Sequence, residues 1–295
     1  MIRSRSQKVF NVINTILLLG VALTCMLPFI YLLASSLSTN EQNVAGNVFL
    51  LPKDFTMEAY KYLLKRPEYF TSLWVSVKRV VIGTAFKMVV VTLTAYALSK
   101  PSSRFRLRTP FMIFFLIINY FGGGMMSSYM VNKELGLVNN FWVLILPGAV
   151  DIWNITMLMN YFRDVPKEIE EAAVIDGCGQ FRMLWNIFIP ISKPGLATIV
   201  LFSMVGHWNS WFDGILYMNS TDNYPLQSYL YTVISGTNLS NTGSLTMEQL
   251  EALKQLGNIN LESAQIFLGA LPIMLVYPFV QKYFVKGIKV GSVKG

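Results

Sequence analysis

Long uncharged apolar runs are the feature that most limits how this chain can fold. Residues 11–34, 110–131 and 263–281 carry no charged side chain. A helix needs roughly 20 apolar residues to cross the hydrocarbon core of a bilayer. Three further runs are long enough but contain between one and three charged residues each: 71–98, 137–162 and 187–212. The pattern predicts an all-α integral membrane protein with six transmembrane helices.

The charge composition supports a membrane protein. Charged residues make up 14% of the chain, whereas a soluble domain carries about 25%. The formal net charge is +8, and we attribute it to the cytoplasmic flanks of membrane helices. No basic run with interleaved aromatic residues lies outside the apolar runs, so we expect no nucleic-acid partner. Two cysteines, Cys25 and Cys178, and one histidine cannot form a disulfide framework or a metal site.

Lysine and arginine are distributed unevenly over the flanks of the six runs. Residues 1–10, 99–109, 163–193 and 282–295 hold 15 of them, and the intervening flanks hold six. The positive-inside rule therefore predicts that both termini are cytoplasmic.

The same topology places two long loops outside, at about 37–70 and 217–261, in a single transmembrane domain over 1–295. The alternative for residues 1–36 is a cleaved signal peptide. The apolar run there is much longer than the h-region of about 7–15 residues that signal peptides have, which favours a retained first span.

An acidic segment at about 163–186 interrupts the apolar sequence on the predicted cytoplasmic side. Pro166 suits the first turn of a helix, and the acidic residues after it lie at the positive end of the helix dipole. Gly177 and Gly179 should interrupt this helix before a second one begins. Small residues and the carboxylate of Glu171 favour docking of a cationic partner surface over catalysis. The residues alone leave open a solvated amphipathic connector.

The segment EAAVIDGCGQFRMLWNIFIP resembles the signature of ATP-binding-cassette (ABC) importer permeases, which is Glu-Ala-Ala, two residues, Asp-Gly-Ala, eight residues and Ile-x-Leu-Pro. The matching residues are Glu171, Ala172, Ala173, Asp176, Gly177, Ile187 and Pro190. Cys178 replaces the usual alanine and Ile189 the usual leucine. The resemblance implies the type I ABC importer permease fold in a bacterial plasma (inner) membrane.

The likeness extends over most of the chain from about residue 70. PISKPGLATIVLFSMVGHWNSWFDGILY is similar to the second permease of carbohydrate importers, the class of the maltose-transporter permeases. FGGGMMSSYMVNKELGLVNNFWVLILPGAV is most similar to a branch that handles complex oligosaccharides. Plant-polysaccharide fragments and alginate are the substrates that this resemblance implies.

The resemblance also implies partners. In this family the signature loop fits a cleft on a separate ATPase subunit and transmits its closure to the membrane helices. Glu171 would meet a basic group there, Gly177 would make the bend, and Val293–Gly295 would reach toward the ATPase pair. The implied partners are a second homologous permease, two copies of the ATPase with its ATP and magnesium, and an extracytoplasmic solute-binding protein. No G-x-x-x-x-G-K-[ST] sequence occurs in this chain, so we expect it to bind no cofactor itself.

Polar, charged and aromatic residues in or near the apolar runs are candidates for the substrate path, because polar residues in a membrane usually face an interior cavity. They are Lys78, Arg79, Lys87, Asn119, Tyr120, Asp151, Trp153, Asn154, His207, Asn209, Trp211 and Asp213. Aromatic faces stack on sugar rings, and Asn and Asp hydrogen-bond hydroxyl groups. The spacing predicts that His207 and Trp211, and likewise Asn209 and Asp213, share helix faces.

Each candidate has a plainer interpretation. Lys78, Arg79 and Lys87 together would favour an acidic oligosaccharide, yet the first two could snorkel to outer headgroups. Trp211 could belong to an aromatic belt at the membrane interface. His207 could be a packing residue, and Asp213 could cap a helix.

Three classes of function compete. The first is a permease subunit of an ATP-driven oligosaccharide importer, which has no catalytic residue of its own. The second is a stand-alone membrane enzyme such as a glycosyl or lipid transferase, and the third is a regulatory or scaffolding membrane protein. An enzyme needs an acid, base or metal constellation, whereas the acidic cluster here lies on a helix that matches a docking motif. This favours the transporter subunit.

Overall fold

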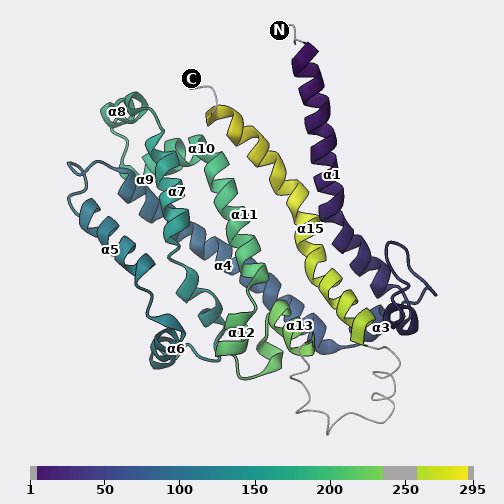
Figure 1. Ribbon diagram of the computed structural model, residues 1–295. Helices are drawn as coiled ribbons and strands as arrows, with labels where there is room; N and C mark the ends of the chain where they lie inside the picture. The colour runs from purple at the N-terminus through teal and green to yellow at the C-terminus, as the bar shows by residue number, and fades with distance from the viewer. Residues whose placement is uncertain (1–4, 235–257, 292–295) are drawn as a thin grey trace. The chain divides into compact units, whose positions relative to one another are not determined.

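The computed structural model describes the backbone of residues 5–234 and 258–291 (Figure 1). These residues form helices and no β-strand, apart from an isolated antiparallel bridge between Ser38 and Phe55. The all-α prediction is therefore confirmed for this part of the chain. Most of the predicted outer loop 217–261, and the tail at Val293–Gly295, lie outside the described residues.

Most of the described helices are joined by short connections, and residues 45–57 form a longer one. They are α1 (Arg5–Ser36), α2 (Asn40–Val44), α3 (Glu58–Leu64), α4 (Pro67–Ser99), α5 (Arg108–Tyr120), α6 (Gly124–Glu134), η1 (Phe141–Leu144), η2 (Leu146–Gly148), α7 (Ile152–Arg163), α8 (Lys167–Ile175), α9 (Gln180–Met183), η3 (Leu184–Phe188), α10 (Ile189–Ile191), α11 (Lys193–Asn209), α12 (Phe212–Tyr217), η4 (Thr221–Asn223), α13 (Leu226–Ile234) and α15 (Asn258–Gly291).

Three of the predicted spans form single long helices. The helical stretches Gln7–Ser36, Pro67–Ser99 and Ile259–Pro278 are long and apolar enough to cross a membrane. The other three apolar runs do not form straight helices. They fall on helix pairs bent by 115°, 51° and 84°, which are α5 with α6, η1–η2 with α7, and α9–α10 with α11.

Local sequence accounts for each bend. Gly122 and Gly123 lie between α5 and α6, and Gly124, the first residue of α6, has a φ of 76°. Glycine adopts this left-handed backbone geometry without the steric cost that other residues pay. Asp151 starts α7 afresh as its N-cap, with its Oδ1 accepting a hydrogen bond from the Asn154 N–H at 3.1 Å. Pro190 and Pro194 flank the break at Ser192, because proline cannot donate the backbone hydrogen bond that would continue a helix.

The chain divides into two compact units. The first comprises Met1–Tyr69 and Thr232–Pro272. In it the end of α1 contacts the first part of α15, where the hydroxyl oxygens of Ser35 and Ser263 lie 2.9 Å apart. A small core joins α3 to α15 through Ala59, Leu63, Leu261 and Ala264. An 18-residue apolar window of α1 has no residue buried within the described chain, so it remains available for lipid or another chain.

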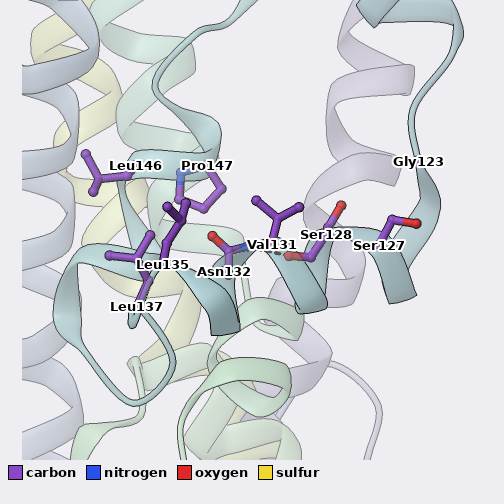
Figure 2. A pocket seen from close by; sticks show the side chains of 9 residues that line it. All are labelled: Gly123, Ser127, Ser128, Val131, Asn132, Leu135, Leu137, Leu146 and Pro147. Atoms are coloured by element: carbon purple, nitrogen blue, oxygen red, sulfur yellow. Dashed lines mark hydrogen bonds between the residues drawn. The ribbon is translucent and has the colours of Figure 1, made fainter.

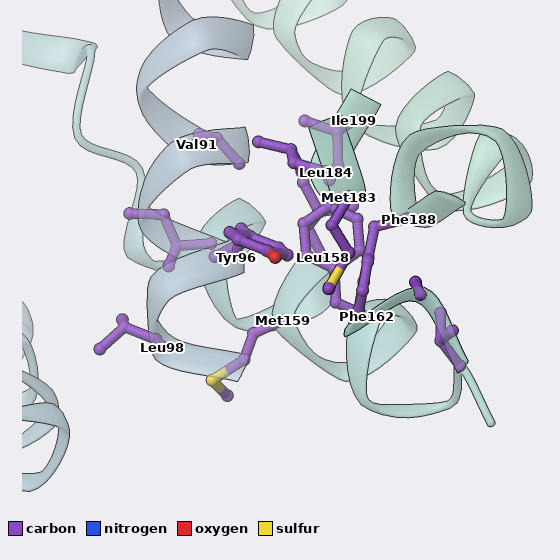
Figure 3. Packing of buried hydrophobic residues seen from close by; sticks show 14 residues of the cluster. Val91, Tyr96, Leu98, Leu158, Met159, Phe162, Met183, Leu184, Phe188 and Ile199 are labelled. Atoms are coloured by element: carbon purple, nitrogen blue, oxygen red, sulfur yellow. The ribbon is translucent and has the colours of Figure 1, made fainter. Parts of the chain in front are cut away.

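The second unit comprises Phe70–Tyr231 and Ile273–Gly295. Its main core joins α4, α7 and the α9–α11 region (Figure 3). Tyr96, Phe162 and Phe188 meet edge to face there, with ring centroids 5.1 to 6.1 Å apart. This is the favourable geometry for aromatic pairs. Within this unit, α8 and α6 lie at opposite ends (Figure 1).

Candidate functional site

The acidic segment forms the short helix, bend and returning helix that its sequence predicts. α8 follows Pro166, which is the N-cap residue rather than the first helical residue. Gly177 has a φ of 72°. The N–H of Cys178 donates to the Ala173 carbonyl at 2.9 Å, and the N–H of Gly177 donates to the Val174 carbonyl at 3.0 Å. These two bonds make a Schellman motif, in which glycine is the residue best suited to the left-handed position.

α8 divides its side chains between the protein core and the surface. Ala173 is buried against the core, whereas Glu171 and Ala172 are exposed. The exposed apolar residues continue along this surface, with Ile175 86% exposed and Val174 47% exposed. No hydrogen bond or ion pair engages Glu171 within the described residues. A small, partly apolar surface with a free carboxylate is suited to contact another protein.

The remaining signature residues position the helix that follows the bend. Asp176 is the exposed C-cap of α8. Ile187 packs against the main core from a π-helical turn, η3. Pro190 lies in α10 directly after it and has no N–H for an α-helical bond to Asn186. The wider π turn is a common way for a helix to accommodate such an irregularity.

Two of the substrate-path candidates, Arg79 and Lys87, lie along one stripe of α4. Arg79, Gly83 and Lys87 are spaced four residues apart, so they share a face of the helix. Each contacts a different neighbour in the second unit: Asp213, His207 and Asp151 respectively. The same spacing continues into the core at Val91 and Ala95, which are fully buried.

Arg79 is more buried than Lys87, with 3% of its side chain exposed against 14%. The two terminal nitrogens of its guanidinium form an ion pair with Asp213, and Nη1 also donates to the Ser210 carbonyl at 3.1 Å. Asp213 also accepts from the Ser210 hydroxyl at 3.0 Å. Such bidentate charge-assisted contacts hold both groups in one geometry. Arg79 therefore does not snorkel.

Lys87 forms a second, looser ion pair. Its Nζ lies 3.4 Å from Oδ2 of Asp151, which also accepts from the Asn154 amide at 2.8 Å. The Asn154 side chain is buried, and its Oδ1 has no hydrogen-bond partner among the described residues. With Asp151 capping α7, these three residues form one polar cluster.

The predicted helix-face pairs at the end of the fifth apolar run are wrong. α11 ends at Asn209, and Ser210 adopts an extended conformation before α12 begins at Phe212. The four-residue spacing of His207 with Trp211, and of Asn209 with Asp213, therefore does not put them on shared faces. The break turns Asp213 toward Arg79, and Trp211 stacks on Tyr231 at a centroid distance of 4.1 Å.

His207 lies against Gly83, where α11 approaches α4 closely. A Cβ atom placed on Gly83 would lie 2.7 Å from Nε2 of His207, which is too short for an unshifted contact. We predict that Gly83→Val destabilises the protein by about 1–3 kcal/mol, because overpacking forces the ring or the helices to move. Thermal unfolding in detergent measures the effect.

Gly206→Val is the matched control for this prediction. Gly206 is exposed on α11, next to His207 in sequence, and a Cβ there would meet nothing within 4 Å. The close-approach interpretation is wrong if the two valine variants unfold at the same temperature.

The other candidates are more exposed and do not join these clusters. Lys78 is exposed, with its Nζ 6.0 Å from the ring centre of Trp74 and 5.9 Å from that of Phe141. Trp153 is 75% exposed. Asn119 and Tyr120 lie exposed at the end of α5. The structure thus separates Lys78 from Arg79 and Lys87, both of which already have carboxylate partners.

A pocket of about 470 Å³ lies elsewhere, between α6 and the segment up to Pro147 (Figure 2). None of the predicted residues lines it. Its lining is mostly apolar, and the Asn132 amide donates internally, to the Ser128 carbonyl at 2.9 Å and to the Tyr217 hydroxyl at 3.2 Å. The pocket therefore offers little free hydrogen-bonding capacity to a sugar.

Sequence reasoning missed three residues that organise these sites. Ser210 and Tyr231 hold the α11–α12 break, through the contacts given above. Glu170 forms ion pairs with Lys100 and Arg104 at the base of α8. The only signal in the sequence is that Glu170 and Glu171 are consecutive helical residues, which point in different directions and can therefore differ in exposure.

The chain is similar to known components of membrane transport systems. The family described as “Binding-protein-dependent transport system inner membrane component” matches residues 89–290, a range that includes α8. Protein LplC of Bacillus subtilis (strain 168) is 38% identical over 292 residues, covering 99% of this chain and 97% of the relative. The polygalacturonan/rhamnogalacturonan transport system permease protein YtcP of the same strain is 38% identical over 294 residues, covering 98% and 99%.

A solved structure extends the likeness to three dimensions. A chain from the crystal structure of a bacterial ABC transporter involved in the import of the acidic polysaccharide alginate superposes with a TM-score of 0.83. It is 32% identical in sequence, and the match covers 96% of this chain and 99% of that one.

Proposed function

The chain belongs to the family of binding-protein-dependent transport system inner membrane components, and from this premise we propose that it imports oligosaccharides or polysaccharide fragments as one permease half of an ABC transporter. The resemblance to ABC importer permeases is confirmed, and so is their fold. The similar proteins are transport-system components rather than enzymes, so the chain is a transporter subunit. The observation that carries the proposal is the signature at 171–190, whose first two residues, Glu171 and Ala172, are exposed on α8.

ATP hydrolysis belongs to other subunits in this proposal. This chain contains no phosphate-binding G-x-x-x-x-G-K-[ST] sequence. Two copies of an ATPase, carrying ATP and magnesium, would dock on α8 of this chain and of a second homologous permease. The exposed Glu171, Ala172 and Ile175 suit such a contact. The family description supports a solute-binding protein as a further partner on the extracytoplasmic side.

The proposed topology has six spans, with both termini in the cytoplasm, and treats residues 1–295 as one permease domain. Three single helices and three bent pairs provide up to six candidate spans. The distribution of Lys and Arg supports a cytoplasmic position for α8. The first apolar helix, α1, would then contact lipid or the second permease.

Transport would proceed by rocking of helix bundles between inward-open and outward-open states. ATPase closure would displace α8 and the core beneath it, which includes the cytoplasmic end of α4. The polar clusters at Arg79, Lys87 and His207 would border the path that opens. Their internal partners suggest that they close the path in this conformation, because buried charges are costly unless they are paired.

We further propose that the substrate is acidic. The two relatives named for polygalacturonan and alginate transport support this, since both polymers carry uronate carboxylates. Lys78 is the free cation of the predicted trio: no carboxylate lies within ion-pair distance of it in the described chain. A lysine that has no carboxylate partner within its own chain can attract a carboxylate from the substrate.

Replacing Lys78 by glutamine should therefore slow uptake of an oligogalacturonate about two- to fivefold, the range expected for one solvent-exposed charge pair. Uptake of a neutral oligosaccharide of equal length, compared in the same proteoliposomes, should change little. Lys133→Gln serves as the control, because Lys133 is exposed on α6 and belongs to none of the polar clusters. Equal slowing of acidic and neutral sugars would contradict a charge-selective role.

Gentle purification from native membranes tests the proposed assembly. Mass spectrometry of the co-eluting chains should identify a second permease and an ATPase with the phosphate-binding sequence. Recovery of this chain alone, under conditions that preserve other complexes, would contradict the proposal.

A further inference from the structure

The two neighbouring glutamates of α8 face different surroundings. Glu171 is exposed, whereas Glu170 is only 16% exposed and turns inward. Consecutive residues of a helix point about 100° apart, so one can meet a partner while the other contacts the chain itself. Glu170 accepts from Nζ of Lys100 at 2.9 Å and forms a second ion pair with Arg104 on the same oxygen, Oε1.

Lys100 is itself held tightly. Only 7% of it is exposed, and its Nζ lies 4.3 Å from the ring centre of Tyr96 and 4.0 Å from that of Phe188. Cations at these distances from aromatic faces are attracted to them, more so where water is excluded. Burial lowers the pKa of Lys100, and the hydrogen bond from Lys100 to Glu170 opposes this effect. The ion pair thus connects α8 to aromatic residues of the main core.

The same contact connects α8 to α4. Lys100 follows directly after Ser99, the last residue of α4. The stripe with Arg79 and Lys87 lies farther along this helix, and through it α4 reaches α12 and the start of α7. A helix transmits displacement along its length because its backbone is hydrogen-bonded throughout. A force on α8 therefore has a short route to the polar clusters through Glu170.

We propose that Glu170 is a positioning residue that clamps the docking helix α8 to the end of α4 and thereby transmits ATPase movement to the substrate path. This inference rests on the proposed function, in which α8 is the docking site. It assigns separate tasks to adjacent carboxylates: Glu171 contacts the partner, and Glu170 holds α8 to its own chain. Arg104, at 45% exposed, reinforces the clamp from the surface.

Glu170→Gln tests the clamp in the full importer. The variant retains the shape of the side chain but loses its charge. We expect the ATPase subunits to co-purify as with the wild type, and ATP hydrolysis to continue. Sugar imported per ATP hydrolysed should fall about tenfold, a moderate loss of coupling between two sites. A wild-type ratio of transport to hydrolysis would overturn the proposal.

Glu168→Gln is the matched control, since it makes the same change two residues away on the same helix. Glu168 is exposed and forms no ion pair within the described chain. Its ratio of transport to hydrolysis should match the wild type, and a loss as large as that of Glu170→Gln would show a general charge effect and overturn the clamp.

A covalent cross-link in place of the ion pair distinguishes a mechanical role of Glu170 from a simple contribution to stability. Cysteines replace Glu170 and Arg104 in a protein whose own Cys25 and Cys178 are changed to serine. A short bis-methanethiosulfonate reagent then joins α8 covalently to the turn between α4 and α5, where residue 104 lies. Coupling should be low before cross-linking and should recover severalfold after it. Complete cross-linking without recovery would overturn the proposal.

The two hypotheses fail in different ways. A wild-type chain that co-purifies with no ATPase contradicts the proposed function, and the clamp with it. A wild-type importer that assembles and transports normally, alongside a fully coupled Glu170→Gln variant, contradicts the clamp alone.

Discussion

Replacing Glu171 with alanine should reduce ATP-driven uptake at least about tenfold, because losing one charge of a desolvated interfacial pair commonly costs 2 kcal/mol or more. Glu171 is exposed and has no ion-pair partner within the described residues. Folding and membrane insertion should therefore be unchanged. Uptake and ATP hydrolysis measured together in proteoliposomes, with the insertion level as reference, report the effect. We expect hydrolysis to be uncoupled from transport.

Glu168→Ala is the appropriate control for this prediction. It removes another exposed carboxylate from α8, outside the signature that starts at Glu171. A Glu171→Ala protein that transports at the normal rate would count heavily against docking at α8.

Asp213→Ala should cause the largest loss of stability. The change leaves Arg79 buried, with the Ser210 carbonyl as its remaining hydrogen-bond acceptor among the described residues. Breaking a buried pair in this way typically costs about 3–5 kcal/mol. Unfolding in detergent, followed by loss of helical signal, measures the difference. The charge is partly screened on the Asp213 side, which is 23% exposed, so the lower end of the range is the firmer expectation.

The double variant Arg79→Met with Asp213→Ala supplies the control. Without the unpaired guanidinium, it should recover most of the lost stability, as buried pairs replaced by apolar groups often do. A single Asp213→Ala variant as stable as the wild type would show that the ion pair contributes little.

The helix, bend and returning helix of the docking segment could be predicted because its determinants are local. Pro166 precedes α8, and Gly177 supplies the positive φ of the Schellman motif. The predicted start differs by one residue, which is the normal uncertainty of a helix boundary.

The bends within the middle apolar runs were harder to predict from the sequence, although the residues that cause them can be recognised once the structure is known. Hydropathy counts apolar residues but does not register where a chain changes direction. The break at Ser210 overturned both predicted helix-face pairs, since one residue with an extended backbone shifts every later side chain around the axis.

The sequence by itself determined the apolar runs, the charge asymmetry and the docking signature, because each depends on residues that are neighbours along the chain. Only the tertiary structure decided which charges are free. Arg79 and Asp213 are 134 residues apart, and Lys87 and Asp151 are 64 apart. No local pattern links residues so distant. Their pairing depends on how α4 packs against α7, α11 and α12, which left Lys78 without a carboxylate and turned Glu170 inward beside an exposed Glu171.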